Sequence, residues 1–447
     1  MTMHGYSLES APPTEAPRGS FAAPTADAPL AATVTVPGSK SLTNRELILA
    51  ALADAPSRLS APLHSVDSYR MGDALRALGV RVDRVPGESP FGEDVEVTPP
   101  RALTGGCEID SGQAGTVMRF VAPLLGLAEG DVHMTADASA LHRPMGTMIK
   151  ALRDLGVDID DGGSWSLPFT VHGHGHIRGG ELEIDASGSS QFVSGLLLAA
   201  PRFDVGLHLK HTGERLPSVP HIDMTIDTLA HRGVHVEHPS PGEWIVPATT
   251  PRGKTVEIEP DLSNAAPFLA AAMVAGGSVT VPSWPARSTQ PGGHLTEILS
   301  LLGARVTRRG GAVTITGGRQ IHGVDLDLSA VSELTPTLVG LAALADQPST
   351  FTGIGHIRTH ETDRIAALTS NLRAIGCGAE ELEDGIRIIP APLHGGEWKS
   401  FHDHRIATTG ALIGLRTPGI VVDDIGTTGK TMPQFVWLWQ RMLAGLE

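Results

Sequence analysis

The phrase LRALGVRVD, Leu75–Asp83, decides the fold, because close variants of it recur along the chain. The other copies are LRDLGVDID, LAHRGVHVE, LSLLGARVT and LRAIGCGAE, and the shared glycines are Gly79, Gly156, Gly233, Gly303 and Gly376. Successive glycines lie 70 to 77 residues apart. Each copy has the pattern of an amphipathic helix that ends at glycine, where a left-handed cap costs least, followed directly by a strand. We therefore expect a repeated α/β unit.

A second phrase keeps the same period and predicts the rest of the unit. Its copies are IDSGQAGTVMRF from Ile109, IDASGSSQFVSG from Ile184, IEPDLSNAAPFL from Ile258 and LDLSAVSELTPT from Leu326. Each predicts the end of a strand, a polar turn and a helix rich in Ala and Leu. One unit thus runs βαβαββ, and partial units at the chain ends complete a sixth copy. Because six units are too many for one core, we expect two compact domains with a cleft between them.

Composition is typical of a globular protein and excludes several classes of function. The chain has 447 residues, of which 41% are hydrophobic, and no apolar run approaches the roughly 18 residues of a membrane span. Its net charge of −15 argues against a general binder of nucleic acid or anionic membranes. Two cysteines, Cys107 and Cys377, fit a reducing cytoplasm. The N-terminus through Leu30 lacks a signal-peptide pattern and is expected to be a disordered tail.

The stretch PGSKSLTNR, Pro37–Arg45, predicts an anion site. A short strand is expected at Ala32–Val36 and a helix at Glu46–Ala53, so residues 39–41 fall at or just before the first helical turn. Free backbone N–H groups, the positive helix end and a lysine favour an anion there. The alternative is that a serine only caps the helix and that the two cations are solvated. The stretch is not a Walker P-loop, because the upstream glycine is missing.

Polar residues also gather at the starts of other predicted helices. Hydroxyls, amides and a glycine at these positions can bind phosphate or carboxylate oxygens. The cations among these residues would neutralise an anionic ligand. Two glutamates could act as general acid and base. Taken singly, each is equally explained by capping or by a surface ion pair. The residues are Gln113, Gly115, Thr116, Arg143, Ser189, Ser190, Gln191, Ser218, Glu333, Glu361, Arg364, Arg405 and Lys430.

Three other patterns are not expected to be functional sites. HETDR, His360–Arg364, lacks the second His of a metalloprotease HExxH helix. HGHGH, His172–His176, places histidines on one face of a strand, but its glycines indicate a turn or a sheet edge. Cys107 has no His near it in sequence and is expected in the core. The sequence therefore predicts no metal site.

Seven motifs resemble those of the 5-enolpyruvylshikimate-3-phosphate (EPSP) synthase family. In chain order, from about Ala32 to Phe435, they are PGSKSLTNR, QAGTVMRF, HRPMG, SSQFVSGLLL, ETDR, DHR and TTGKTMP. The resemblance implies the enolpyruvyl transferase fold, in which two domains of three βαβαββ repeats form an active site in the interdomain cleft. It implies a discontinuous domain at 31–39 plus 257–447 and an inserted domain at 40–256, after a tail at 1–30.

The resemblance also implies an activity. The enolpyruvyl group of phosphoenolpyruvate would pass to the 5-hydroxyl of shikimate 3-phosphate, with release of phosphate, in the shikimate pathway of aromatic amino acid biosynthesis. No metal, organic cofactor, nucleic acid or membrane is implied, and a cytoplasmic monomer is expected. Since Gly115 is retained, the family further implies inhibition by glyphosate in competition with phosphoenolpyruvate.

The resemblance assigns a role to each polar position. Phosphoenolpyruvate would be bound through its phosphate and carboxylate by Lys40, Arg143, Lys430, Arg364 and Arg405, with Gly115 allowing close backbone approach. Shikimate 3-phosphate would be bound by Lys40, Ser41, Arg45, Ser189, Ser190, Ser218, Glu333, His356 and His360, and Gln191 would touch both substrates. Glu333 would accept the 5-hydroxyl proton, and Glu361, together with Lys40, would protonate the methylene carbon of phosphoenolpyruvate.

The sequence departs from the family pattern at four positions. Glu333 stands where many members have Asp, which keeps a carboxylate and changes its reach. His356 and His360 stand where Asn and Lys are usual. A neutral imidazole at 360 would hold a substrate anion less strongly above about its reference pKa of 6.5. His221 replaces a more usual Tyr beside Ser218.

Two alternative functions stay open at this point. UDP-N-acetylglucosamine enolpyruvyl transferases share the fold, but they typically have a reactive Cys on the loop where this chain has Ser139–Gly146 and no Cys. A non-catalytic anion-binding repeat protein would be expected to lack one of the acid–base pair, yet Glu333 and Glu361 are both present.

Overall fold

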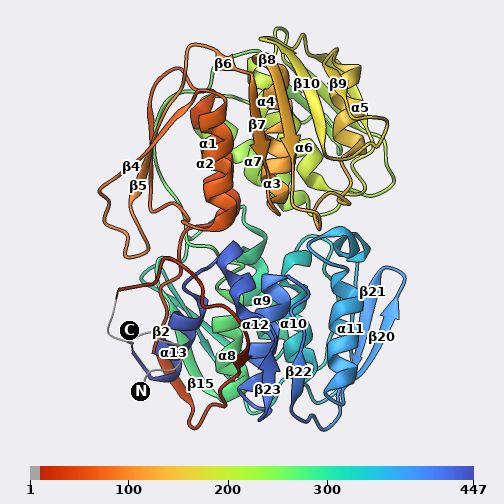
Figure 1. The fold of residues 1–447 in the computed structure, drawn as a ribbon. Helices are drawn as coiled ribbons and strands as arrows, with labels where there is room; N and C mark the ends of the chain where they lie inside the picture. The colour runs from red at the N-terminus through yellow and green to blue at the C-terminus, as the bar shows by residue number, and fades with distance from the viewer. Residues whose placement is uncertain (1–10, 447) are drawn as a thin grey trace. The chain divides into compact units, whose positions relative to one another are not determined.

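The structure is a computed structural model, and it describes residues 11–446. The chain divides into two compact units (Figure 1). One unit joins the N-terminal segment up to Pro37 to the chain from Glu259 onward, and the other runs continuously from Gly38 to Ile258. Each unit holds three of the six sheets found among the described residues. In every sheet a parallel strand pair is extended by an antiparallel strand, as the βαβαββ pattern predicts.

The continuous unit contains twelve strands and seven α-helices among its residues. The strands are β3 (Ser57–Ser60), β4 (Arg81–Val85), β5 (Asp94–Thr98), β6 (Leu103–Thr104), β7 (Cys107–Asp110), β8 (Ala128–Thr135), β9 (Asp158–Asp160), β10 (Phe169–His174), β11 (Gly180–Ile184), β12 (Leu207–His211), β13 (Glu243–Val246) and β14 (Thr255–Glu257). The helices are α1 (Lys40–Ala51), α2 (Val66–Ala77), α3 (Gly115–Phe120), α4 (Ala122–Gly126), α5 (Gly146–Asp154), α6 (Ser190–Ala199) and α7 (Val219–His231). A 3₁₀ turn, η1 (Ala200–Arg202), directly follows α6.

The discontinuous unit repeats this plan with segments from both ends of the chain. Its strands are β1 (Phe21–Ala22), β2 (Leu30–Thr33), β15 (Gly277–Val281), β16 (Arg305–Arg309), β17 (Ala312–Thr316), β18 (Asp325–Asp327), β19 (Ser349–Thr352), β20 (Gly378–Leu382), β21 (Gly385–Ile389), β22 (Gly396–Trp398) and β23 (Ile420–Val422). Its helices are α8 (Ala266–Ala275), α9 (Leu295–Leu301), α10 (Thr335–Ala342), α11 (Arg364–Ala374), α12 (His404–Gly414) and α13 (Phe435–Leu443), and its 3₁₀ turns are η2 (Pro291–His294), η3 (Ser332–Leu334), η4 (Gly355–Thr359) and η5 (Ile425–Lys430).

The repeat phrases fold as expected. All five shared glycines follow a helix with φ between 82° and 102°, the left-handed region that glycine enters without strain. The helices rich in Ala and Leu are buried on all sides: α10 buries every residue, and α6 every residue except Gln191. Three such helices pack together in each unit, α1, α3 and α6 in one and α8, α10 and α12 in the other. Within residues 11–446 no helix is long and apolar enough to cross a membrane.

One local prediction was wrong, and one gave a strand with shifted bounds. The segment up to Leu30 is not a disordered tail over its described residues, because Phe21 is fully buried and β1 pairs with β23 in an antiparallel ladder. The Ala- and Pro-rich composition of this segment indicated disorder, although the segment contains the buried Phe21 and the strand β1, whose partner β23 lies far along the chain. The remainder of the predicted tail, residues 1–10, lies outside the described residues. The strand expected at Ala32–Val36 is β2, which pairs with β15 and ends at Thr33.

Candidate active site

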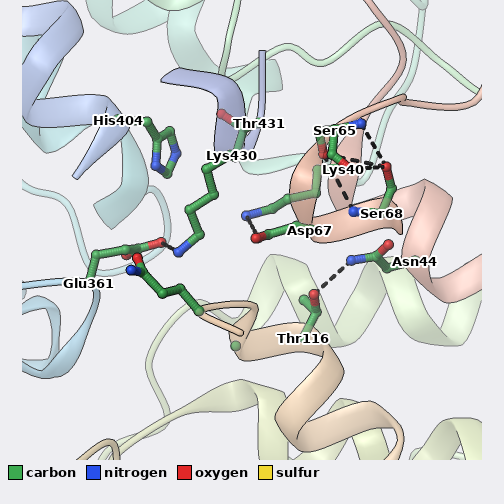
Figure 2. Close-up of polar contacts among 12 residues, drawn as sticks. Lys40, Asn44, Ser65, Asp67, Ser68, Thr116, Glu361, His404, Lys430 and Thr431 are labelled. Carbon is green, nitrogen blue, oxygen red and sulfur yellow. Dashed lines mark hydrogen bonds and ion pairs between the residues drawn. The ribbon is translucent and has the colours of Figure 1, made fainter. Parts of the chain in front are cut away.

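In the continuous unit, the first turn of α1 holds a lysine beside a buried carboxylate. Ser39 is the N-cap of α1, the role that the sequence left open for a serine as the alternative to an anion site, and its hydroxyl accepts a hydrogen bond from the Leu42 backbone N–H. Lys40 is the first helical residue, and its Nζ lies 3.4 Å from Oδ2 of Asp67 on α2 (Figure 2). Asp67 is buried, whereas Lys40 keeps part of its surface exposed. The cation is therefore oriented from one side while it stays accessible to an anion.

Arg45 lies one turn further along α1, where it is 1% exposed. It donates hydrogen bonds to the Thr225 hydroxyl at 2.8 Å and to the backbone carbonyls of Ser41 at 2.9 Å and His221 at 2.8 Å. The guanidinium thus joins the start of α1 to the start of α7. It fixes the backbone of Ser41, which is itself a predicted substrate ligand.

Two arginines and an amide surround the N-terminus of α3. Arg119 donates to Oε1 of Gln191 at 3.3 Å and to the carbonyl of Gly115 at 3.4 Å. Arg143 donates to the carbonyl of Gln113 at 2.9 Å. The structure thus brings together three residues that the sequence predicts for phosphoenolpyruvate, namely Gly115, Arg143 and Gln191.

The space at Gly115 makes a specific prediction. A Cβ atom there would lie 2.7 Å from Nη1 of Arg119 and 3.5 Å from both Nη1 of Arg143 and Oε1 of Gln191. Gly115→Ala is expected to raise the KM for phosphoenolpyruvate about tenfold, because the Arg119 guanidinium, which hydrogen-bonds to Gln191, would have to move, and to leave the KM for shikimate 3-phosphate within about threefold. Steady-state kinetics with each substrate varied in turn would measure both values.

The matched control for this variant is Gly188→Ala. A Cβ atom at Gly188 would meet nothing within 4 Å, so this substitution should leave both KM values unchanged. Equal rises of both KM values in Gly115→Ala would contradict a local effect on phosphoenolpyruvate.

The predicted serines lie at the starts of α6 and α7. Ser189 is the N-cap of α6, and its hydroxyl accepts from the Gln191 backbone N–H at 3.2 Å. Ser190 is buried as the first residue of that helix. Ser218 precedes α7 with φ 52° and ψ 46°, a left-handed conformation that is strained for a residue other than glycine. Such strain, about 1–3 kcal/mol, typically persists where function requires the conformation.

In the discontinuous unit, a carboxylate lies between two cations. Oε1 of Glu361 is 2.8 Å from Nζ of Lys430, and Oε2 is 3.0 Å from Nη2 of Arg364 (Figure 2 shows the first pair). Lys430 is the last residue of η5, and Arg364 begins α11. Two predicted ligands of phosphoenolpyruvate and the predicted proton donor are therefore in direct contact.

Arg364 is anchored by a second, fully buried carboxylate. Its Nε donates to Oδ2 of Asp403 at 2.7 Å, and Asp403 also caps α12 by accepting from the Arg405 backbone N–H at 2.8 Å. Burial alone would lower the pKa of Arg364, but the carboxylates of Asp403 and Glu361 raise it above its ordinary value. The guanidinium therefore stays cationic at every ordinary pH, and its partner fixes the start of α12, where Arg405 lies.

Glu333, the predicted general base, lies in η3 at the start of α10. Its Oε1 accepts a hydrogen bond from the Ser263 hydroxyl and is 4.0 Å from Nη2 of Arg405. A nearby cation and a hydroxyl donor both favour the ionised carboxylate. An ionised carboxylate is the form that can accept a proton.

Two histidines that depart from the family pattern lie at η4, His356 within it and His360 as its C-cap. Nε2 of His356 is 2.8 Å from the Ser332 hydroxyl, beside Glu333. Arg364 donates to Nδ1 of His360 at 3.2 Å. Because a guanidinium can only donate, Nδ1 of His360 is the acceptor in this contact.

Three contacting residues were missed by the sequence reasoning: Asp67, Arg119 and Ser263. Arg119 and its partner Gln191 are 72 positions apart, and Ser263 and Glu333 are 70 apart. Lys430 and Glu361 are 69 apart, and Asn44 bonds Thr116 over 72 positions. These separations are close to the repeat period, so a search for polar residues one period from each candidate could have found Arg119 and Ser263.

The histidine-rich strand does not gather into a metal site. His172 pairs with Asp131 at 2.8 Å, and His176 pairs separately with Asp204 at 3.1 Å. Among the residues that the structure describes, no three His, Cys, Asp or Glu side chains are grouped so as to hold a metal ion.

Comparison with known proteins gives one consistent result. Residues 24–439 match the family model described as EPSP synthase (3-phosphoshikimate 1-carboxyvinyltransferase). The chain is 50% identical over 419 residues to a 3-phosphoshikimate 1-carboxyvinyltransferase of Kocuria rhizophila, covering 93% of this chain and 94% of the relative. Two solved structures of EPSP synthase from Acinetobacter baumannii are similar, with TM-scores of 0.77 and 0.76 and identities of 26% and 25%. They cover 96% and 95% of this chain and 98% of each of those chains.

Proposed function

The chain belongs to the EPSP synthase (3-phosphoshikimate 1-carboxyvinyltransferase) family, and from this premise we propose which residues perform its reaction. It has EPSP synthase activity in the shikimate pathway and acts in aromatic amino acid biosynthesis. Its substrates are phosphoenolpyruvate and shikimate 3-phosphate. The observation that supports our assignment best is the direct contact of Lys430, Glu361 and Arg364.

We assign the binding of phosphoenolpyruvate to five of the predicted cations. Lys40, Arg143 and Lys430 bind its phosphate, and Arg364 and Arg405 bind its carboxylate, since planar guanidinium groups match a carboxylate in two-point hydrogen bonds. Bound substrate would compete with Glu361 for Lys430 and Arg364. A carboxylate that loses cationic partners is protonated more readily, which suits Glu361 as the acid that protonates the methylene carbon.

We assign the acceptor to the serines and to Glu333. Shikimate 3-phosphate is bound by Ser41, Arg45, Ser189, Ser190 and Ser218, with Lys40, Gln191, His356 and His360 as further contacts. Glu333 accepts the proton of the 5-hydroxyl as its oxygen bonds to C2 of phosphoenolpyruvate, and the methylene carbon gains a proton from Glu361 or Lys40. The resulting phospho-ketal then loses phosphate, which takes up the proton held by Glu333, while a methyl proton returns to the group that donated it, so that the double bond is restored. The cations stabilise the departing phosphate.

The acceptor on which these residue roles rest is tested by phosphate release from phosphoenolpyruvate, in the presence of a chelator, with two acceptors compared. Release with shikimate 3-phosphate alone is expected. Release with UDP-N-acetylglucosamine alone would transfer the assignment to the related transferases, and release with neither would support the binding-protein alternative.

We further propose that the enzyme acts as a monomer in the cytoplasm. Both cysteines, Cys107 and Cys377, are free, which fits a reducing compartment. Light scattering coupled to gel filtration would measure the oligomeric state, and a dimer mass would contradict the proposal.

A further inference from the structure

The N-terminal arm, residues 13–23, runs antiparallel to the segment 420–434 along its length. At one end, β1 pairs with β23, with Phe21 opposite Val422. Further along, the Gly19 carbonyl accepts from the Ile425 backbone N–H at 3.1 Å. At the other end, the Pro13 carbonyl accepts from Nε2 of Gln434 at 2.9 Å. The arm therefore spans η5 from the strand before it to the helix after it.

Two glycines of η5 allow the arm to lie close. A Cβ atom at Gly429 would be 3.2 Å from Cβ of Ala16, and one at Gly426 would be 3.1 Å from the Pro17 carbonyl oxygen. Neither glycine has a positive φ, so neither is required by its own backbone conformation. A side chain at Gly429 would therefore disturb the packing of the arm against η5 and would not strain the backbone of residue 429 itself.

The turn that the arm covers has little intrinsic stability. It is a six-residue 3₁₀ helix, a form with poor hydrogen-bond geometry that is seldom longer than a few residues. Within the turn, Asp424 caps the Gly426 N–H at 2.9 Å, and Thr427 and Thr428 make local hydroxyl contacts. The turn also packs against α12 and α13, so the arm covers the face that these helices leave. Its last residue is Lys430, whose ammonium contacts Glu361. An error in the position of η5 would move that ammonium directly.

We propose that the N-terminal arm is a positioning element that holds η5, and with it Lys430, in place for phosphoenolpyruvate. This inference rests on the proposed role of Lys430. Besides the proposed ligands of phosphoenolpyruvate and of shikimate 3-phosphate, the site then includes residues of the arm. These residues do not touch a substrate and act through η5. The arm thereby makes affinity for one substrate depend on a segment at the start of the chain.

Removal of residues 2–19 tests the inference directly, since it takes away the arm beside η5 and keeps Phe21. The expected result is a rise of about fivefold to tenfold in the KM for phosphoenolpyruvate, with the KM for shikimate 3-phosphate within about twofold. Hydrogen exchange of the amides of residues 425–431 should become faster, which a purely general loss of stability would not confine to this turn. Removal of residues 2–11, which keeps every arm contact named above, is the matched control and should change neither quantity.

A full-length variant keeps the test decisive if the shortened chain folds poorly. Gly429→Leu places a side chain against Ala16 and should give the same rise in the KM for phosphoenolpyruvate. Gly293→Leu is its control, because a Cβ atom there would meet only the Ser288 carbonyl oxygen at 3.9 Å. Unchanged KM and unchanged exchange in both arm variants would overturn the inference.

Lys430→Met, measured in parallel, separates this inference from the proposed function. If Lys430→Met raises the KM for phosphoenolpyruvate and the arm variants do not, the arm proposal alone is wrong. If Lys430→Met leaves that KM unchanged, the assigned role of Lys430 is wrong, and the substrate part of the arm proposal is refuted with it.

Discussion

Glu333→Gln is expected to lower kcat by about two to four orders of magnitude while the KM for shikimate 3-phosphate changes less than about threefold. The amide keeps the size of the side chain and can still accept from Ser263, but it cannot take up the 5-hydroxyl proton. An interaction needed only in the transition state lowers kcat without weakening substrate binding. Steady-state phosphate release, with substrate binding measured separately by calorimetry, provides both values.

Ser263→Ala is the control for this experiment. It removes the hydroxyl donor and leaves the carboxylate of Glu333 and its neighbour Arg405 in place, so its kcat should fall far less. Equal losses of turnover and of shikimate 3-phosphate affinity in Glu333→Gln would refute the role of general base.

Arg364→Met is expected to damage both stability and substrate binding. Asp403 is fully buried, and its carboxylate would lose the paired cation, a loss that costs about 3–5 kcal/mol when one partner of a buried ion pair is removed. The same change removes one of the two cations beside Glu361 and a proposed ligand of the phosphoenolpyruvate carboxylate. Thermal unfolding should show a lower midpoint, and calorimetry should show loss of phosphoenolpyruvate binding in the presence of shikimate 3-phosphate.

The double variant Arg364→Met with Asp403→Asn separates these two effects. Removal of the unpaired buried charge should restore part of the unfolding midpoint, because a neutral amide is cheaper to bury than a carboxylate. Phosphoenolpyruvate binding should stay lost, since the guanidinium is still absent. Recovery of binding together with stability would show that Arg364 acts only on the fold.

Much of the fold could be predicted from the sequence because its strongest signals are local. A glycine after an amphipathic helix specifies the cap whatever the surroundings, and all five repeat glycines have the expected positive φ. An Ala- and Leu-rich run such as α8 must be buried on all sides, and it is. The strand β1 was not predicted because its partner β23 is remote in sequence. The burial of Phe21 was not predicted because the average composition of a segment does not show that one of its side chains is buried.

In the candidate site, too, some residues could be predicted from the sequence and others could not. The family motifs identified the residues at the helix starts, and those residues lie at helix starts in the structure, Lys40 at α1, Ser190 at α6 and Arg364 at α11. The partners that orient them could not be predicted, because contacts such as Lys40 with Asp67 depend on how whole helices pack. Nor could the sequence alone predict that Arg45 would be almost fully buried.

The pairing of β2 with β15 has a consequence for synthesis of the chain. β2 ends at Thr33 and β15 begins at Gly277, so about 240 residues must follow β2 before its partner exists. At about 5–20 residues per second, that is an interval of about 10–50 s. The continuous unit from Gly38 to Ile258 is complete within it and can fold first, whereas β1 waits until Ile420–Val422 has been made. An unpaired strand is a template for association with other chains. A chain that is still being synthesised is therefore most prone to aggregate through its N-terminal strands, β1 and β2.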